Sequence, residues 1–465
     1  MFSPRIVFVV LTSVLLLVAC GFPAALKPAR ETPGAYLIEN AAVLDVDTGE
    51  IAADRFIYVE DGIIRHVGHE RPEAVAAGAA RIDVLGAVVL PGLIDMHVHV
   101  FDEADLAANL AYGVTTIRNL GGMPFHLPMA QQIEQGRLLG PRLITTGTIL
   151  NERDGRNTND LQTLVAGADR ARAAVRRQYR AGFRHLKVYS NLSRESLAAI
   201  LDEAAQLGMT VSGHPVEGTE ADPLEMADTL AGGFTTIEHA ESIVWFGLSD
   251  NTDPAMARAL AQQMAAANSR VTPTLIVHHN LARIVETDGA HVTRPDMHSF
   301  SPVMQGFEQG RYDYWASYPH DDRTRMQAFY VEMTGYMHEA GVELVVGTDA
   351  GVMVTPHGVS VSEEIELLVD AGLSPLEALQ AATLNSAGAL DMADRIGRVE
   401  VGYASDLLIV QGNPLEDFAV LRRPVGVMRG QRWLDAEDLA QLQVVSSNPA
   451  EFRTWRRVIG HVLTR

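Results

Sequence analysis

The sequence is poor in cysteine and in basic charge. Cys20 is the only cysteine in 465 residues, so the chain cannot form an internal disulfide and offers no cysteine nucleophile beyond residue 20. Lysine and arginine together number 37 against 58 aspartates and glutamates, which gives a formal net charge of −21. Nucleic-acid partners require basic surfaces that contact phosphates, so we expect no nucleic-acid partner. The net charge does not select a substrate.

Long hydrophobic runs are also scarce, and the clearest one lies at the N-terminus. Arg5 precedes an apolar run over residues 6–19, which is too short for a comfortable membrane span and is typical of a secretory signal peptide. The run ends in Leu-Val-Ala-Cys, which resembles the bacterial lipobox, where the cysteine becomes the lipidated first residue. A plain signal peptide with a chance cysteine is the alternative. We therefore predict an exported bacterial lipoprotein anchored to a membrane at Cys20, facing the periplasm or the exterior, with a signal peptide over 1–20 and a tether over 21–34.

The remaining chain is typical of a large globular protein, with 47% hydrophobic residues overall. Residues 35–90 contain short β-branched runs separated by Asp-Thr-Gly and Glu-Asp-Gly turns, a pattern that predicts hairpins. Similar runs return at 397–412 and 425–434. We expect them to pair with the N-terminal strands in a small β-sandwich domain built from residues 35–90 and 395–440. Residues 441–465 read as a polar helical extension without an evident role.

Between these parts, over residues 91–394, strands alternate with helices. Eight apolar runs at 93–100, 114–120, 142–148, 183–190, 209–214, 235–240, 270–279 and 343–349 read as strands. Helical patterns lie between most of them, as at 193–208, and another follows at 374–390, where Ser374 and Pro375 suit the N-cap and the first helical position. Eightfold alternation predicts an α/β fold of the (β/α)8 TIM-barrel type. The long aromatic-rich segment between strands seven and eight is read as either a lid or an extra packed helix.

Side chains of metal-binding types recur at the ends of these predicted strands. His97 and His99 are two residues apart in a strand, so both project to one side. The C-terminal strand ends form the catalytic face of such barrels. A single histidine at a strand end is more often a core residue than a metal ligand. The prediction therefore depends on several strands that each end in a side chain able to bind a metal. A nitrogen-rich set with a carboxylate suits zinc or a similar divalent ion. The candidate ligands are His97, His99, Lys187, His214, His239 and Asp349.

Lys187 needs its own explanation, because an ammonium group cannot bind a cation. Burial lowers the pKa of lysine and exposes a reactive amine. A neutral amine can take up carbon dioxide to become a carbamate, which is an anionic ligand able to bridge two metal ions. The alternatives are that Lys187 orients the substrate or pairs with Asp349.

The chain resembles the amidohydrolase superfamily in its imidazolonepropionase-like and prolidase-like branch. The resemblance rests on residues 91–99 (PGLIDMHVH), 185–189 (HLKVY), 212–215 (SGHP), 237–240 (IEHA), 347–351 (GTDAG) and 401–414 (VGYASDLLIVQGNP). It implies two divalent ions, with zinc the first expectation. His97 and His99 would bind the α ion, His214 and His239 the β ion, and carboxylated Lys187 would bridge them. Asp349 would contact the α ion and act as the catalytic residue.

The resemblance implies a hydrolase that cleaves a C–N bond of a small substrate such as a dipeptide, an N-acyl amino acid or a cyclic amide. Divalent cations lower the pKa of bound water toward neutrality, which makes hydroxide available for attack. Asp349 would accept a proton and pass it to the leaving nitrogen. Hydrolysis of a lactone, ester or phosphotriester is the alternative reaction, and a non-catalytic binding lipoprotein is the alternative of another class. Homo-oligomerisation stays open.

Two departures from the family pattern bear on the substrate. Arg118-Asn119 stands where relatives often have Arg-Asp, and Pro215 stands where prolidase-like relatives have a tyrosine that holds a carboxylate. A dipeptidase with a proline leaving group is therefore less favoured. The candidates for substrate contacts, each with an alternative role in packing or support, are Arg118, Tyr189, His278 and His357.

Overall fold

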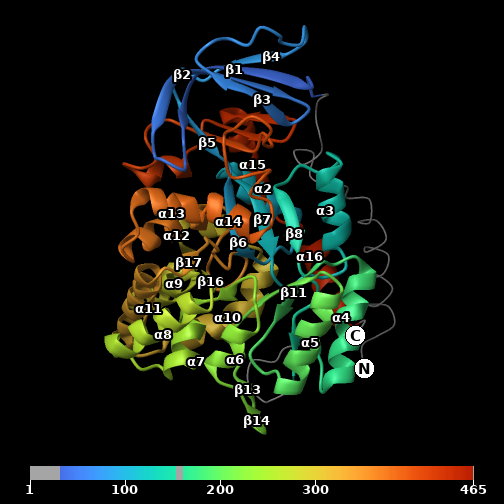
Figure 1. The fold of residues 1–465 in the computed structure, drawn as a ribbon, viewed down its shortest axis with the longest axis vertical. Coiled ribbons are helices and arrows are strands. Elements are labelled where there is room, and N and C mark those ends of the chain that lie inside the picture. The colour runs from blue at the N-terminus through green and yellow to red at the C-terminus, as the bar shows by residue number, and fades with distance from the viewer. Residues whose placement is uncertain (1–31, 153–160, 464–465) are drawn as a thin grey trace, which may run out of the picture.

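The computed structural model describes residues 32–152 and 161–463 (Figure 1). The predicted signal peptide, the lipidation site at Cys20 and nearly all of the predicted tether therefore lie outside the described residues. Within those two ranges, no helix is both long enough and apolar enough to cross a membrane.

Eight parallel strands form the central layer of the fold. Three of them pair in the order β6–β7–β8, and five pair in the order β11–β12–β15–β16–β17. Single parallel bridges link Thr146 to His185 and Val98 to Ala350 between these two groups. Each strand lies within a run predicted from the sequence, which gives a TIM-barrel-type α/β fold. The strands are β6 (Leu93–Val98), β7 (Val114–Asn119), β8 (Arg142–Thr145), β11 (His185–Val188), β12 (Thr210–Gly213), β15 (Ile237–Glu238), β16 (Arg270–Thr272) and β17 (Glu343–Leu344).

Helices follow most of these strands, as the alternation predicts. The helix predicted at 193–208 is α5 (Arg194–Gln206), whose N-cap is Ser193. Further helices in this part of the chain include α2 (Glu103–Ala111), α3 (His126–Glu134), α4 (Ala168–Ala181), α6 (Met226–Ala231), α7 (Ala240–Leu248), α8 (Pro254–Ala266) and α12 (Val359–Asp370).

Strands from both ends of the chain share a second sheet, in the order β20-β19-β18-β5-β1-β2-β3, with β4 paired to β1. β18 shows how this sheet separates two cores. Leu407 and Ile409 pack into one hydrophobic cluster with β1, β2 and β3, whereas Leu408 and Val410 pack into the cluster shared with the barrel. The strands are β1 (Ala35–Leu44), β2 (Ile51–Glu60), β3 (Ile63–Gly68), β4 (Ala80–Asp83), β5 (Val88–Pro91), β18 (Leu407–Val410), β19 (Gly426–Arg429) and β20 (Arg432–Asp435). A β-sandwich made by this sheet stays a prediction.

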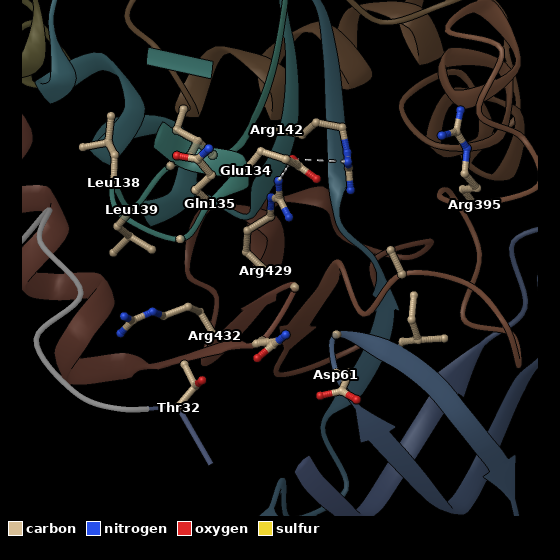
Figure 2. Close-up of a pocket in the computed structure, with 18 of the residues that line it drawn as sticks. Thr32, Asp61, Glu134, Gln135, Leu138, Leu139, Arg142, Arg395, Arg429 and Arg432 are labelled. Carbon is tan, nitrogen blue, oxygen red and sulfur yellow. Dashed lines mark ion pairs between the residues drawn. The ribbon is translucent and has the colours of Figure 1, made fainter. Parts of the chain in front are cut away.

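A buried carboxylate joins this sheet to the barrel. Asp406, next to β18, lies 3.2 Å from Nη2 of Arg142 on β8 and 3.3 Å from Nη1 of Arg429 on β19. Figure 2 shows Arg142 and Arg429 beside Glu134 at the edge of a cavity between the two parts of the fold. The two arginines therefore share one buried counter-charge.

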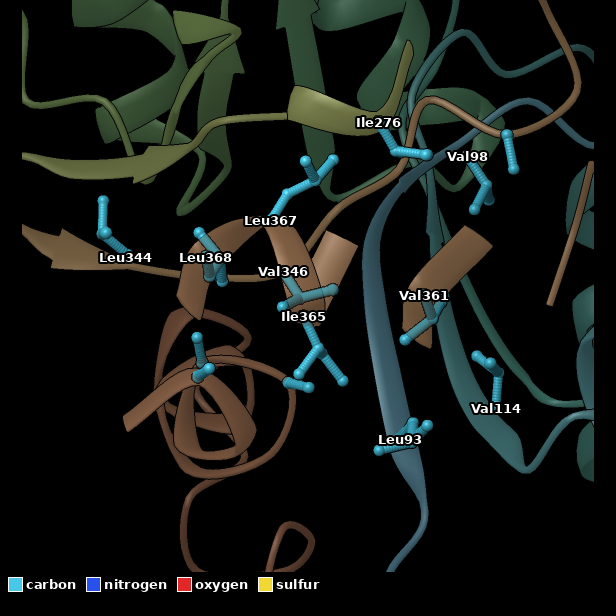
Figure 3. Packing of buried hydrophobic residues seen from close by; sticks show 14 of the residues in the cluster. Leu93, Val98, Val114, Ile276, Leu344, Val346, Val361, Ile365, Leu367 and Leu368 are labelled. Atoms are coloured by element: carbon cyan, nitrogen blue, oxygen red, sulfur yellow. The ribbon is translucent and has the colours of Figure 1, made fainter. Parts of the chain in front are cut away.

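The largest hydrophobic cluster lies between the barrel strands and their helices. Figure 3 shows Leu93 and Val98 of β6 together with Val361 and Ile365 of α12, all in this cluster. Burial of a side chain of this size stabilises the fold by about 1.5–3 kcal/mol. This packing holds the β6 backbone rigidly and therefore fixes the direction of His97.

The prediction of the seventh strand is wrong for the second half of its range. The sequence predicts a strand over 270–279, but β16 ends at Thr272 and α9 (Leu275–Glu286) follows. Pro273 cannot donate a backbone hydrogen bond to the ladder. Thr274 then adopts a left-handed conformation with φ 49°. The side-chain oxygens of Glu364 accept from the backbone nitrogens of Leu275 and Ile276 and cap the helix N-terminus. This cap comes from α12, far along the chain, so the local pattern could not reveal it.

The long segment before strand eight is mostly helical. It contains η2 (Ala290–Thr293), η3 (Pro295–Ser299), α10 (Pro302–Ala316) and α11 (His320–Ala340). α11 packs against α8 and α9, as expected of a packed helix, whereas α10 packs against α9 and the C-terminal helix. The helix predicted at 374–390 begins with Ser374 as N-cap and Pro375 in the first turn, but it is divided into α13 (Pro375–Ala381) and α14 (Leu384–Ala389).

The C-terminal extension, to which the sequence assigned no role, covers a pair of buried acids. It consists of α15 (Ala436–Ser446) and α16 (Glu451–Leu463). Arg453 lies 2.7 Å from Glu103 and 3.1 Å from Asp102, and Arg457 lies 2.7 Å from Glu103. Both acidic side chains are only 1% exposed. Asp102 is the N-cap of α2 and Glu103 is its first residue, shortly after β6, which carries His97.

Replacing Arg453 with Ala is expected to destabilise the protein by roughly 3 kcal/mol, because it leaves buried carboxylates short of a counter-charge. Chemical denaturation would measure this loss. Arg456→Ala is the matched control, because Arg456 is exposed on the same helix. Equal, small effects for the two variants would show that α16 is not held by these ion pairs.

Candidate metal centre

Three side chains from three separate segments meet at the C-terminal end of the barrel strands. The possible ligand atoms of His97, His239 and Asp349 all lie within 4.8 Å of one another, and all three residues are buried. The rings of His97 and His239 are 4.7 Å apart between centroids, and those of His97 and His99 are 5.5 Å apart. The His214 ring lies 4.4 Å from that of His239. The structure therefore brings all four predicted histidine ligands into one cluster.

Asp349 faces two of these histidines. Its Oδ1 lies 2.9 Å from Nε2 of His99 and 3.3 Å from Nε2 of His97. Its backbone nitrogen donates to the carbonyl of His97 at 2.7 Å, which locks the segment after β17 against β6. Burial raises the pKa of the Asp349 carboxyl, but the neighbouring His97 and His99 outweigh this and hold the pKa well below its usual value. Asp349 is therefore a carboxylate, the form that can bind a cation.

The approach of these two segments requires glycine at position 351. A Cβ on Gly351 would lie 2.1 Å from the carbonyl oxygen of His99, and the residue has φ 100°. Asp349 itself has φ 58°, which is uncommon for a residue with a side chain. Strained backbone of this kind persists where the surrounding structure over-determines it, as at functional sites.

Three of the histidines are held through Nδ1, which leaves Nε2 available. Nδ1 of His97 lies 2.8 Å from a carboxylate oxygen of Glu238. Nδ1 of His239 contacts Oγ1 of Thr274 at 2.7 Å, and Nδ1 of His214 contacts Oγ of Ser242 at 3.2 Å. Metal-binding histidines are oriented in this way by a partner on the second ring nitrogen.

Burial also keeps these imidazoles neutral. It lowers the pKa of His97 to about 4 and lowers the pKa values of His214 and His239 well below 6.5. A neutral imidazole is the form that donates a lone pair to a metal ion. The donor set therefore fits a divalent cation.

Lys187 is buried beside this cluster, and its Nζ has no hydrogen-bond partner among the described residues. The side chain is 1% exposed. Burial lowers the pKa of Lys187 to about 8. An unpaired ammonium in such a place is costly, whereas a neutral amine is tolerated and can react. The orphaned nitrogen fits the predicted carbamate that would share its oxygens with cations.

A buried ion pair supports the cluster from behind. Glu238 is fully buried, and Arg118 lies 2.9 Å from its Oε1. Arg118 also donates to the carbonyl of Met96 and to Oγ of Ser212. This pair connects β7, β12 and β15 beneath His97. Glu238 lies within the 237–240 motif, from which no role could be predicted for it. A glutamate inside a predicted barrel strand, where a buried charge needs a partner, was the available signal.

Replacing Thr274 with Val is expected to lower metal affinity by about 10- to 100-fold, because it removes the hydroxyl that orients His239 while keeping the side-chain shape. Competition with a chelator of known affinity would measure the change. Thr334→Val is the matched control, since its buried hydroxyl bonds only the carbonyl of Tyr330 within α11. Unchanged affinity in the Thr274 variant would remove this hydroxyl from the support of the site.

The comparison with protein families decides the classification. The sequence model of the Amidohydrolase family matches residues 88–432. The chain belongs to the amidohydrolase family. The resemblance inferred from the motifs is thereby confirmed, and prolidase-like proteins are among the structural neighbours of this amidohydrolase. Family membership and hydrolase relatives support a hydrolase, and members of the family typically depend on metal ions.

Proteins similar to this amidohydrolase include an ochratoxinase, a bottromycin amidohydrolase and a putative prolidase. Ochratoxinase from Aspergillus niger is 23% identical over 83% of each chain. The structure of bottromycin amidohydrolase is 26% identical with a TM-score of 0.75, and covers 93% of this chain and 94% of its own. A putative prolidase from Bifidobacterium longum is 26% identical with a TM-score of 0.68, and the match covers 90% of this chain and 100% of that one.

The four predicted substrate contacts occupy different positions in this amidohydrolase. Tyr189 lies near the site, with its ring centroid 4.1 Å from that of His214 and the two rings tilted by 43°. His278 accepts from Arg323 at 2.6 Å and lies within 4.0 Å of Glu241. His357 is buried behind the site, with Nε2 3.3 Å from the carbonyl of His99. The buried bonds of Arg118 and His357 favour support of ligands over direct contact, and contact with substrate stays a prediction for all four.

Proposed function

We propose that this amidohydrolase cleaves the C–N bond of an amide or peptide in a small substrate such as a dipeptide, an N-acyl amino acid or a cyclic amide. Its site would lie at the mouth of a closed (β/α)8 barrel and hold two divalent ions, with zinc preferred. The observation that carries the proposal is the convergence of neutral His97 and His239, the Asp349 carboxylate and the orphaned Lys187 amine. Amide-hydrolysing relatives support the same reaction class.

Each residue has a distinct role in this proposal. His97, His99, His214 and His239 would hold the ions, with a carboxylated Lys187 between them. Bound divalent ions would supply an activated water and polarise the scissile carbonyl. Asp349 takes the proton of the attacking water and returns it to the leaving nitrogen, which cannot depart as an anion. Glu238 keeps the proton of His97 on Nδ1, so that Nε2 faces the ions.

A substrate screen after metal loading tests the proposal. The purified protein, stripped with a chelator and reloaded with zinc, would be offered dipeptides, N-acyl amino acids, cyclic amides, lactones and phosphotriesters. We expect metal-dependent cleavage in one of the amide classes. Faster cleavage of lactones or phosphotriesters would reassign the bond type. A protein that retains no metal and cleaves nothing would instead be a binding protein on this scaffold.

We further propose that the protein is exported and held at a bacterial membrane through a lipid on Cys20. Replacing Cys20 with Ser should release the protein from the membrane fraction of cells into the soluble fraction, because the side chain that would carry the lipid is lost. Mass spectrometry of the N-terminal peptide would identify the modification. Unchanged fractionation together with an unmodified cysteine would contradict the anchor.

A further inference from the structure

A cavity of about 620 Å³ lies between the terminal sheet and the barrel, away from the candidate metal centre. None of the six candidate metal ligands is among the described residues that line it. Its walls come from α3 and the loop after it, from the β2–β3 turn, and from the β19–β20 turn. The cavity is therefore bounded by parts of the chain that have no role in the proposed hydrolysis.

The charge of this cavity is opposite to that of the protein. Its lining contains four arginines against two acids, whereas the whole chain carries a net charge of −21. Buried Asp406 adds one carboxylate behind the lining, next to two of these arginines. Even so, basic groups outnumber acidic ones. The lining arginines are Arg142, Arg395, Arg429 and Arg432.

Arg142 and Arg429 share one close carboxylate, that of Asp406. Asp406 is 3% exposed and contacts both guanidinium groups. Burial raises the pKa of Asp406, but Arg429 and Arg142 outweigh this and lower it below its usual value, so one negative charge faces two positive ones. Nε of each arginine is also buried without a hydrogen-bond partner in the described part of the chain. The pair therefore carries more positive charge than its one close carboxylate balances.

Glu134 shows where an additional oxyanion would be attracted. Its carboxylate lies 3.8 Å from Nη1 of Arg142 and 3.9 Å from Nη2 of Arg429, both too long for hydrogen bonds. Its side chain is 67% exposed, so this contact is weak and easily displaced. Figure 2 shows Glu134 between these two arginines, with Arg432 and Asp61 on the further walls.

We propose that this cavity binds the phosphate group of a phosphate ester. A phosphate carries more charge and more acceptor oxygens than a carboxylate, so it can bond two guanidinium groups that approach from different sides. The volume exceeds that of a bare phosphate, and Leu138, Leu139 and Met392 provide apolar walls for an attached organic group. The ester is either a soluble metabolite or the headgroup of an anionic phospholipid. Thr32, at the start of the described chain, lines the same cavity.

The first test is titration of the zinc-loaded protein with inorganic phosphate at constant ionic strength. Calorimetry measures the binding, and the melting temperature is recorded with and without phosphate. We expect saturable binding that raises the melting temperature. Glu134→Gln should tighten binding, and Arg432→Gln should weaken it, each by about two- to fivefold, since each changes one partly exposed charge. Arg456→Gln, on the exposed face of α16, is the control and should change neither value. Phosphate bound at the metal ions would not have its affinity raised by the Glu134 substitution and lowered by the Arg432 substitution, because both residues line the cavity.

Arg142 and Arg429 are avoided as test positions, because loss of either partner of buried Asp406 could prevent folding. A second experiment measures binding of the protein to vesicles of phosphatidylglycerol and phosphatidylcholine and to vesicles of phosphatidylcholine alone. The protein used here lacks the lipid proposed on Cys20, so that the lipid itself does not hold it on the vesicles. Cavity-dependent binding to inorganic phosphate alone would assign a soluble ester, and cavity-dependent binding to the anionic vesicles would assign a headgroup. Absence of both, or binding that is equal in the Glu134 and Arg432 variants, would overturn the proposal.

Discussion

Replacing Asp349 with Asn is expected to leave the protein folded and to lower kcat by about a hundred- to ten-thousandfold, the usual contribution of a general acid–base group. An amide can still occupy the space beside His97 and His99 and can offer an oxygen to an ion. It cannot accept the proton of the attacking water or return it to the leaving nitrogen. The loss should therefore appear in kcat far more than in KM.

Asp394→Asn is the control for this variant, because the Asp394 side chain is 83% exposed and lies outside the cluster. Steady-state kinetics on an amide substrate would be compared at equal zinc content for both variants. Circular dichroism and melting temperature would show that the fold is retained. If the Asp349 variant turned over within a fewfold of the unmodified protein, Asp349 could not be the proton carrier.

Short motifs predicted most of the centre because its ligands lie at strand ends. In a parallel barrel, the ends of all strands meet at one face, so His97, His214 and His239 could be placed together without any tertiary information. The structure places their rings within 4.7 Å of a neighbour in this set. The alternation of strands and helices predicted the TIM-barrel-type fold for the same reason: it depends on local periodicity.

The supporting contacts could not be predicted, because they join residues distant in sequence. Glu364 caps α9 from a helix that begins more than seventy residues later, which turned half of a predicted strand into a helix. Arg453 lies 351 residues from Asp102 and Arg457 lies 354 residues from Glu103, so the sequence alone could not show that the C-terminal extension pairs with these acids. The periodicity of helices and strands does not report contacts between distant residues. The only indication in the sequence is a charged residue expected to be buried, which requires a partner.

Replacing Lys187 with Ala is expected to abolish measurable turnover and to reduce the metal content from about two equivalents per chain, as a two-metal site requires. The reason is that the variant lacks the nitrogen on which an anionic bridge could form. Acetate or propionate should restore part of both properties, because a short carboxylate can enter the space left by the side chain. Metal analysis and kinetics with and without the added acid would measure this.

The carbamate itself can be detected directly, because Lys187 is the only lysine after residue 27. Zinc-loaded protein equilibrated with ¹³C-bicarbonate should give a single ¹³C carbamate resonance from the folded chain, and the Lys187 variant should give none. Zinc removal should weaken the signal, since the ions and the carbamate stabilise each other by mass action. A zinc-replete, active protein without that resonance would show that Lys187 acts as an amine, either pairing with Asp349 or orienting the substrate.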